Sequence, residues 1–199
     1  MADFKQLDRS FEELLQDRAA IFSPEHYSAD VARIVDSLTD CLSSGNRIYW
    51  CGNGGSAAEA SHLAAEFTGR FLREREGLPS EALAANLSTV TAIGNDFGFD
   101  FIFSRQIEAM GKPGDVVVAL TTSGKSPNIV EAFKAAKARN MTSVLLSGNG
   151  GGPALEFADI AIVGPTSYSA VVQELHLILG HIICDLVEQR MMAKAGVAG

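Results

Sequence analysis

Residues 115–139 read DVVVALTTSGKSPNIVEAFKAAKAR. The stretch from Asp115 to Leu120 is typical of a buried strand, and Ser126 to Arg139 is typical of a helix. The loop between them places four hydroxyl side chains around a glycine: Thr121, Thr122, Ser123 and Ser126. One hydroxyl is enough to cap a helix. Four hydroxyls suit the several acceptor oxygens of a phosphate monoester, so the loop predicts phosphate binding in preference to a plain turn.

Strands and helices alternate on both sides of this segment. Strands are expected at 47–51, 82–87, 115–120, 142–146 and 159–163. Helices are expected at 4–22, 28–43, 56–72, 88–94, 98–110, 126–139 and 167–192. The alternation predicts an α/β fold with a central, mostly parallel sheet and helices on both faces. Ligands of such sheets bind at the carboxyl ends of the strands, which is where the hydroxyl loop lies.

The bulk composition is that of one globular domain, 1–199. Of the 199 residues, 47% are hydrophobic and 20% are charged, and the net charge of −8 argues against a nucleic-acid surface. No uncharged apolar run approaches the ~18 residues that a membrane span needs. The N-terminus lacks a signal peptide and the three cysteines are scattered, so we expect a cytoplasmic protein without disulfides.

Two amphipathic helices within 1–45 precede the α/β core of 46–199, which ends in a long helix. Their apolar stripes are expected to pack on the core or on a partner subunit.

A second polar loop follows the first expected strand. Residues 50–62 read WCGNGGSAAEASH, where Gly52 and Gly54 allow a sharp turn and Asn53 lies between them. Ser56 lies near the start of a helix, where free N–H groups favour an anion. A tight turn with a serine cap explains the loop equally well. Nucleotide-binding spacings are absent.

Several side chains with metal-binding or acid/base chemistry lie on two helices. His62 and Glu66 are four residues apart and share one helix face, directly after the glycine loop. Gln173 and His181 share a face of the last helix. Imidazole and carboxylate are ordinary zinc ligands, and the amide oxygen of Gln173 is a weaker one. His176 is interpreted as core packing, with a supporting role near the site as the alternative.

Three segments carry a specific resemblance to a known family. They are GNGGSAAEASHLAAEFTGRF at 52–71, AIGNDFGFDFIFSRQIEA at 92–109 and VQELHLILGHIICDLVE at 172–188. The chain resembles the phosphoheptose isomerase family of the sugar isomerase (SIS) domain superfamily, over almost its whole length.

The resemblance implies a set of site residues. One Zn²⁺ per subunit is expected on His62, Glu66, Gln173 and His181, with Glu66 and His181 as the acid/base pair. The substrate contacts that it implies are Asn53, Gly54, Ser56, Arg70, Asn95, Asp96, Thr121, Thr122, Ser123, Ser126 and Gln173. For Arg70 an ion pair with Glu66, four residues earlier, is the alternative. For Asp96 the alternative is a helix cap.

The resemblance also implies an activity and an assembly. The expected reaction is aldose–ketose isomerisation of sedoheptulose 7-phosphate to D-glycero-D-manno-heptose 7-phosphate through an enediol. That reaction supplies precursors of ADP- or GDP-heptose for lipopolysaccharide core or capsule. A homotetramer is expected, with sites between subunits and neither nucleic acid nor membrane as partner.

Four positions depart from the family pattern. Ala170 and Val171 replace a polar residue and an arginine, Val172 replaces isoleucine, and Lys125 replaces an asparagine of the phosphate loop. Isomerisation of another phosphosugar is therefore an alternative. A further alternative is a scaffold of the kind that associates with the replication initiator DnaA, although a scaffold does not need the histidine and carboxylate set.

Overall fold

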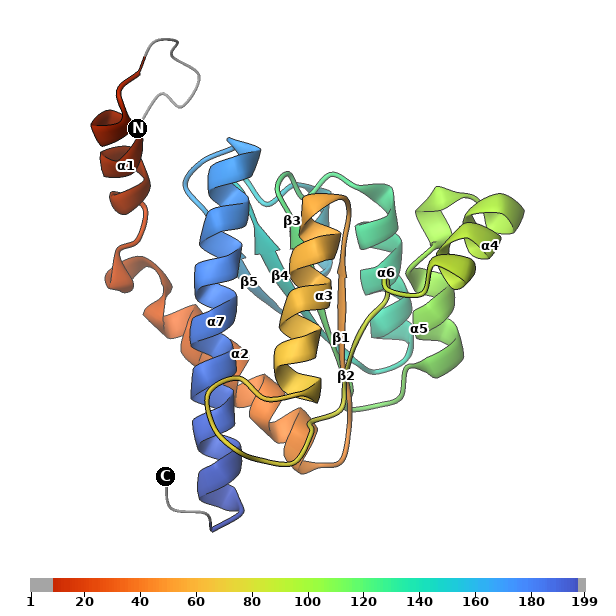
Figure 1. The fold of residues 1–199 in the computed structure, drawn as a ribbon. Coiled ribbons are helices and arrows are strands. Elements are labelled where there is room, and N and C mark those ends of the chain that lie inside the picture. Colours follow the sequence, from red (N-terminus) through yellow and green to blue (C-terminus); the bar gives the residue numbers. More distant parts are fainter. Residues whose placement is uncertain (1–8, 197–199) are drawn as a thin grey trace.

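A single parallel sheet of five strands forms the centre of the molecule (Figure 1). The computed structural model describes residues 9–196. The strand order is β2-β1-β3-β4-β5, and each neighbouring pair is parallel. The strands are β1 (Ile48–Gly52), β2 (Ser80–Ala82), β3 (Val116–Thr121), β4 (Thr142–Ser147) and β5 (Ile160–Val163). The predicted α/β class with a parallel sheet is confirmed.

Helices cover both faces of the sheet, as the alternating pattern predicted (Figure 1). The helices α2, α3 and α7 lie on one face, and α5 and α6 lie on the other. The α-helices are α1 (Phe11–Ala19), α2 (Pro24–Ser43), α3 (Gly55–Thr68), α4 (Leu87–Phe97), α5 (Ser104–Met110), α6 (Pro127–Ala138) and α7 (Ser169–Lys194). Two short 3₁₀ helices are η1 (Phe99–Phe101) and η2 (Pro153–Phe157).

The central strands are buried on both faces, which explains their continuous apolar sequences. Every residue of β1 and of β3 is buried. Trp50 faces the α2, α3 and α7 side and packs on Phe67 with ring centroids 5.8 Å apart. Its neighbour Cys51 faces the α5 and α6 side. Successive side chains therefore build two separate apolar cores, one on each face of the sheet.

Some expected boundaries were wrong, and backbone geometry explains why. The helix expected at 4–22 is observed as α1, while residues 4–8 of that expectation lie outside the described residues. The strand expected at 82–87 ends at Ala82, because the chain turns there and the Asn86 side chain caps α4. The helix expected at 56–72 ends at Thr68, and an irregular segment follows.

The last helix is apolar enough to be mistaken for a membrane span. Ser169–Lys194 contains a window with a mean hydropathy of 1.6, although half of that window is buried inside the fold. Here α7 packs against α2 and α3 as a core helix. Its apolar character therefore has an explanation in packing.

Helices α3 and α7 approach each other closely at Gly180. A Cβ atom at this position would lie 2.6 Å from Cδ1 of Leu63, so a larger residue does not fit without a shift. This contact fixes the separation of two helices that carry candidate site residues. It is the packing feature on which the site geometry depends.

Replacing Gly180 by alanine tests this contact. We expect the free energy of unfolding of Gly180→Ala to lie about 1–3 kcal/mol below that of Gly94→Ala in urea denaturation, because both gain helix propensity but only Gly180→Ala overpacks the core. Gly94→Ala in α4 is the matched control, because the nearest atom to its added Cβ is 3.8 Å away. Leu63→Ala combined with Gly180→Ala should cost less than the sum of the single changes. Strictly additive losses would contradict the proposed contact.

Candidate active site

Three candidate metal ligands from distant parts of the chain converge between α3 and α7. His62 and Glu66 lie on α3 and His181 lies on α7, and their ligand atoms are all within 4.8 Å of one another. The Nε2 atoms of His62 and His181 are 2.8 Å apart. The His62 Nε2 is 3.5 Å from Oε1 of Glu66. The structure thus brings together three of the four predicted metal ligands.

This cluster fits a zinc ion by its chemistry. Two nitrogen lone pairs 2.8 Å apart repel each other unless a proton or a cation lies between them. A carboxylate beside them adds negative charge, which favours a cation further. Two imidazoles and one carboxylate are a donor set that catalytic zinc uses, with a fourth position for water or substrate. His62 is about half exposed, so the cluster is accessible from solvent.

A polar cavity lies at the carboxyl ends of β1 and β3. Its lining combines hydroxyl and amide side chains from both predicted loops and from the start of α7: Asn53, Ser56, Leu120, Thr121, Thr122, Ser123, Ser126, Ser169 and Gln173. The two loops predicted separately from sequence therefore line one cavity. All four hydroxyls of the second loop reach it.

Local backbone geometry explains the shape of the hydroxyl loop. Gly124 has φ +64°, and a Cβ there would lie 1.7 Å from the carbonyl oxygen of Gly151, so only glycine fits. Its N–H donates to Oγ1 of Thr121 over 3.1 Å. Ser126 precedes α6, yet its side chain makes no capping hydrogen bond. The Ser126 hydroxyl therefore remains available to a ligand, as does the N-terminus of α6.

The two loops are joined by an amide pair that sequence reasoning missed. Asn53 and Asn128 exchange hydrogen bonds of 2.9 and 2.8 Å. Asn128 is 1% exposed, so the pair is a buried brace beneath the cavity. Ser169 was also missed, and its hydroxyl donates to Oγ1 of Thr122 over 3.2 Å. Neither partner is near in sequence, so no local pattern signals these contacts.

Gln173 lies where it can connect the cavity with the cluster. Its Nε2 donates to Oγ of Ser56 over 3.4 Å, and its amide packs closely against Gly55. It shares α7 with His181, about two turns away. The structure places Gln173 in the cavity lining, and its substrate contact stays a prediction.

Comparison with known proteins places this arrangement in a family. Residues 18–148 match the model of the SIS domain family. The phosphoheptose isomerase of Burkholderia pseudomallei is 46% identical over 88% of this chain and 89% of its own. The phosphoheptose isomerase of Rhodospirillum rubrum is 48% identical over 81% of this chain and 86% of its own. The chain belongs to the phosphoheptose isomerase family.

Solved structures of this family share the fold of the SIS-domain chain. A phosphoheptose isomerase from Francisella tularensis superposes with a TM-score of 0.82 and 31% identity, over 91% of this chain and 99% of that one. The phosphoheptose isomerase of Neisseria gonorrhoeae superposes with a TM-score of 0.78 and 38% identity, over 88% of this chain and 91% of that one. The named proteins in these comparisons are isomerases.

Four predicted substrate contacts of this family member lie outside the cavity lining: Gly54, Arg70, Asn95 and Asp96. Arg70 follows the end of α3 and pairs with Glu74 at 3.3 Å, so the alternative ion pair with Glu66 was wrong. Asn95 and Asp96 lie inside α4, exposed to solvent, where the Asn95 amide donates to Asp96 over 2.8 Å. Asp96 is near the end of α4, so the helix-cap alternative was wrong as well.

The departures from the family pattern have different environments. Val171 and Val172 are completely buried at the start of α7, where they pack in the core. Ala170 and Lys125 are exposed. Lys125 contributes its backbone N–H to Oγ of Ser123 at 3.3 Å. Apolar side chains at 171 and 172 therefore belong to the packing of α7 against the sheet.

Glu59 and His176, on the two helices that carry the cluster, each have buried side-chain atoms without a hydrogen-bond partner among the described residues. Glu59 lies on α3 between Ser56 and His62, and burial raises the pKa of its carboxyl to about 7, against an opposing hydrogen bond from Ser56. His176 is 1% exposed, and neither ring nitrogen has a partner among the described residues. Burial lowers the pKa of His176 to about 4. Its burial agrees with core packing.

The lowered pKa of His176 predicts a pH dependence of stability. The unfolded chain binds a proton at this histidine below its ordinary pKa of 6.5, whereas the folded chain resists protonation down to about pH 4. Stability therefore falls as pH falls through this window, by about 2 kcal/mol between pH 7 and pH 5. Urea unfolding with a metal chelator measures it. The fall in the free energy of unfolding between pH 7 and pH 5 should be smaller by about 2 kcal/mol in His176→Leu than in the parent protein. An equal fall in both proteins would contradict the role of His176.

Proposed function

We propose that this protein is an aldose–ketose isomerase that interconverts sedoheptulose 7-phosphate and D-glycero-D-manno-heptose 7-phosphate. One observation carries the proposal: His62, Glu66 and His181 converge beside a cavity of hydroxyl and amide groups. The relatives named above are phosphoheptose isomerases, which supports the same activity here. The reaction would supply heptose precursors for lipopolysaccharide or capsule in the cytoplasm.

The cavity holds the phosphate end of the substrate. Hydroxyls of Thr121, Ser123 and Ser126 and the N-termini of α3 and α6 present donors to phosphate oxygens. Asn53, Ser56 and Thr122 also line this cavity, and Gly54 at the start of α3 is a further proposed contact. Anchoring the phosphate orients the distant C1–C2 end toward the cluster, which lowers the entropic part of the barrier.

Glu66 and His181 move the protons. In the open-chain ketose, the Glu66 carboxylate takes a proton from C1, and the C2 carbonyl becomes an enediol. The same carboxyl returns the proton to C2, while His181 transfers the hydroxyl proton from the C1 oxygen to the C2 oxygen. The product is the aldose, with no net gain or loss of atoms or electrons.

A metal ion fits this cluster, with His62, Glu66, His181 and Gln173 as its candidate ligands. When bound, zinc supplies positive charge to the oxygens at C1 and C2. Glu66 is then needed both as a ligand and as a base. Its carboxylate has two oxygens, so the two tasks can fall to different atoms. Arg70, Asn95 and Asp96 remain proposed substrate contacts, contributed at the surface of each subunit.

The direct test is aldose formation from sedoheptulose 7-phosphate with metal-stripped protein, before and after zinc is restored. We expect turnover to be low without metal and to return with zinc. No turnover by folded, zinc-loaded protein would overturn the substrate assignment and favour another phosphosugar or a scaffolding role.

A matched pair of variants tests the base in the same assay. Glu66→Gln keeps the shape but removes the base, so kcat should fall at least 10²-fold. Glu131→Gln is the control, since it removes a surface carboxylate of α6 that pairs with Lys134. Near-normal turnover by Glu66→Gln would exclude Glu66 as the base.

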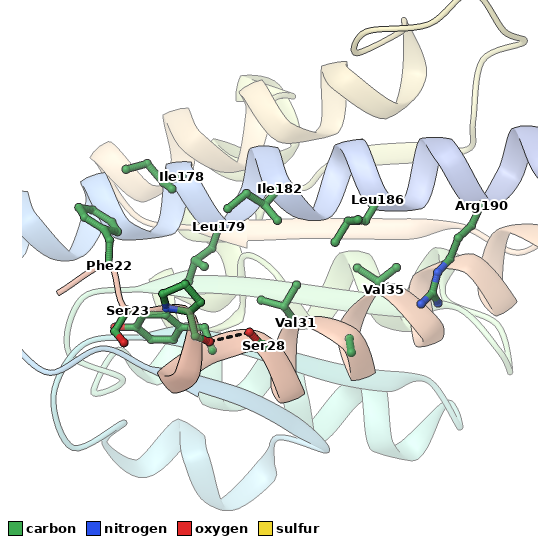
Figure 2. Close-up of a pocket in the computed structure, with 13 residues that line it drawn as sticks. Phe22, Ser23, Ser28, Val31, Val35, Ile178, Leu179, Ile182, Leu186 and Arg190 are labelled. Atoms are coloured by element: carbon green, nitrogen blue, oxygen red, sulfur yellow. Dashed lines mark hydrogen bonds between the residues drawn. The ribbon is translucent and has the colours of Figure 1, made fainter. Parts of the chain in front are cut away.

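An apolar groove between α2 and α7 supports the proposed homotetramer. Figure 2 shows Val31 and Val35 of α2 facing Ile178, Ile182 and Leu186 of α7 across it. These three α7 side chains are 43%, 45% and 36% exposed.

The amphipathic helix α1 extends this apolar surface. It has no buried residue, and its Phe11 and Leu15 are 72% and 54% exposed. Figure 1 shows α1 projecting from the sheet, while Arg18 ties its end to Glu174 of α7. We propose that other subunits cover the groove and α1.

A charge inside the groove should prevent this assembly. We expect Ile182→Glu to have a lower molar mass than the parent tetramer by light scattering at equal concentration. Subunit association would bury an unpaired carboxylate in this variant. Val163→Glu is the control, since it places the same charge on an exposed apolar residue of β5 outside the groove. A monomeric parent protein would refute the tetramer.

A further inference from the structure

The segment that follows α3 crosses the outer side of α7. Residues 69–79, here called the strap, leave the end of α3, loop across α7 and return to β2 (Figure 1). The strap has no regular secondary structure of its own. Its backbone N–H and C=O groups therefore need partners other than a helix or a strand.

Glu188 of α7 is the main anchor of the strap. Its carboxylate is 1% exposed and accepts hydrogen bonds of 3.0 Å from the backbone N–H groups of Phe71, Leu72 and Arg73. It also pairs with Nε of Arg75 at 2.9 Å. Burial opposes the charge, but the N–H donors and Arg75 outweigh it and hold the pKa of Glu188 below its ordinary value. The carboxylate is buried, charged and fully partnered.

Arg75 connects this anchor with the end of α3. Its side chain is 7% exposed, and its guanidinium donates to the carbonyl oxygens of Glu66 and Phe67 at 2.8 and 2.9 Å. These carbonyls belong to the last turn of α3, where a cation is favourable. The Glu188–Arg75 pair thus locks the strap to both α7 and α3. Each of these helices carries part of the candidate active site.

The anchored strap places the ring of Phe71 against His181 of the candidate active site. Phe71 stacks on the imidazole of His181, with centroids 5.4 Å apart and planes 21° apart. His181 also meets His62 edge-on, at 5.1 Å and 76°. Glu188 is seven residues after His181 on α7, so both point to the same side of the helix. One residue holds the strap backbone, and the other receives its aromatic ring.

We propose that Phe71, anchored through its backbone by Glu188, is a positioning residue that fixes the ring plane of His181. The Phe71 ring covers one face of the imidazole and His62 meets its Nε2 edge, so turning the imidazole would lose both contacts. This role rests on the proposed function, in which His181 is both a candidate metal ligand and a proton carrier. Groups that hold a metal-binding histidine by hydrogen bonds affect affinity or activity roughly 10- to 100-fold, and we expect the stacked Phe71 ring to act within the same range.

Substitutions of Phe71 test this role with three independent readouts. Phe71→Leu removes the aromatic face but keeps an apolar side chain, and Phe71→Tyr keeps the face. We expect Phe71→Leu to weaken zinc binding roughly 10- to 100-fold in competition with a chromophoric chelator, and to lower kcat similarly with little change in KM. In metal-free protein, the NMR signals of the His181 ring, assigned with His181→Gln, should lose their ring-current shift. Phe71→Tyr should restore all three.

Leu72→Ala is the matched control, because its side chain is 60% exposed on the same strap. It should leave zinc affinity and the His181 signals unchanged. Unchanged zinc affinity and unchanged His181 signals in Phe71→Leu would overturn the proposal. If the parent protein fails to isomerise sedoheptulose 7-phosphate, the zinc and NMR measurements still decide the role of Phe71. Glu188→Gln should reproduce Phe71→Leu if it folds, and the Phe71 variants decide the question if it does not.

Discussion

The close packing of α3 against α7 is the constraint on which the candidate site depends. His62 and His181 are separated by 119 positions in the chain, yet their Nε2 atoms are 2.8 Å apart. That proximity requires two helix axes at short range, and the absence of a side chain at Gly180 permits it. At the far end of α3, the Glu188–Arg75 pair holds the same two helices together. The cluster of His62, Glu66 and His181 lies between these two contacts.

The polar cavity and the cluster come from different parts of the fold, and the same helix packing brings them together. The polar cavity is a property of the sheet, since it forms where β1 and β3 end. The cluster is a property of the helix pair. Helix α7 runs past both, because it carries Gln173 in the cavity lining and His181 about two turns later.

The sequence predicted the features that depend on the pattern of neighbouring residues. The strand at 115–120 and the helix at 126–139 were found within one residue, because a continuous apolar run and an amphipathic helix that begins with proline have strong signals. His62 and Glu66 were paired by helical spacing alone, and the joining of α3 to α7 followed from family resemblance. The Asn53–Asn128 brace and the strap were not foreseen. Both depend on contacts between residues that are 75 to 117 positions apart, which no window of sequence displays.

The cavity lining described here is electrically neutral. Its side chains are hydroxyls, amides and one leucine, and Lys125 beside it is directed to solvent. The phosphate is a spectator that is identical in ketose and aldose, so any grip on it strengthens substrate and product binding equally. Neutral dipoles orient an anion without the tight retention of an ion pair. Because an isomerase must release either sugar to turn over, an uncharged cradle would favour turnover in the proposed reaction.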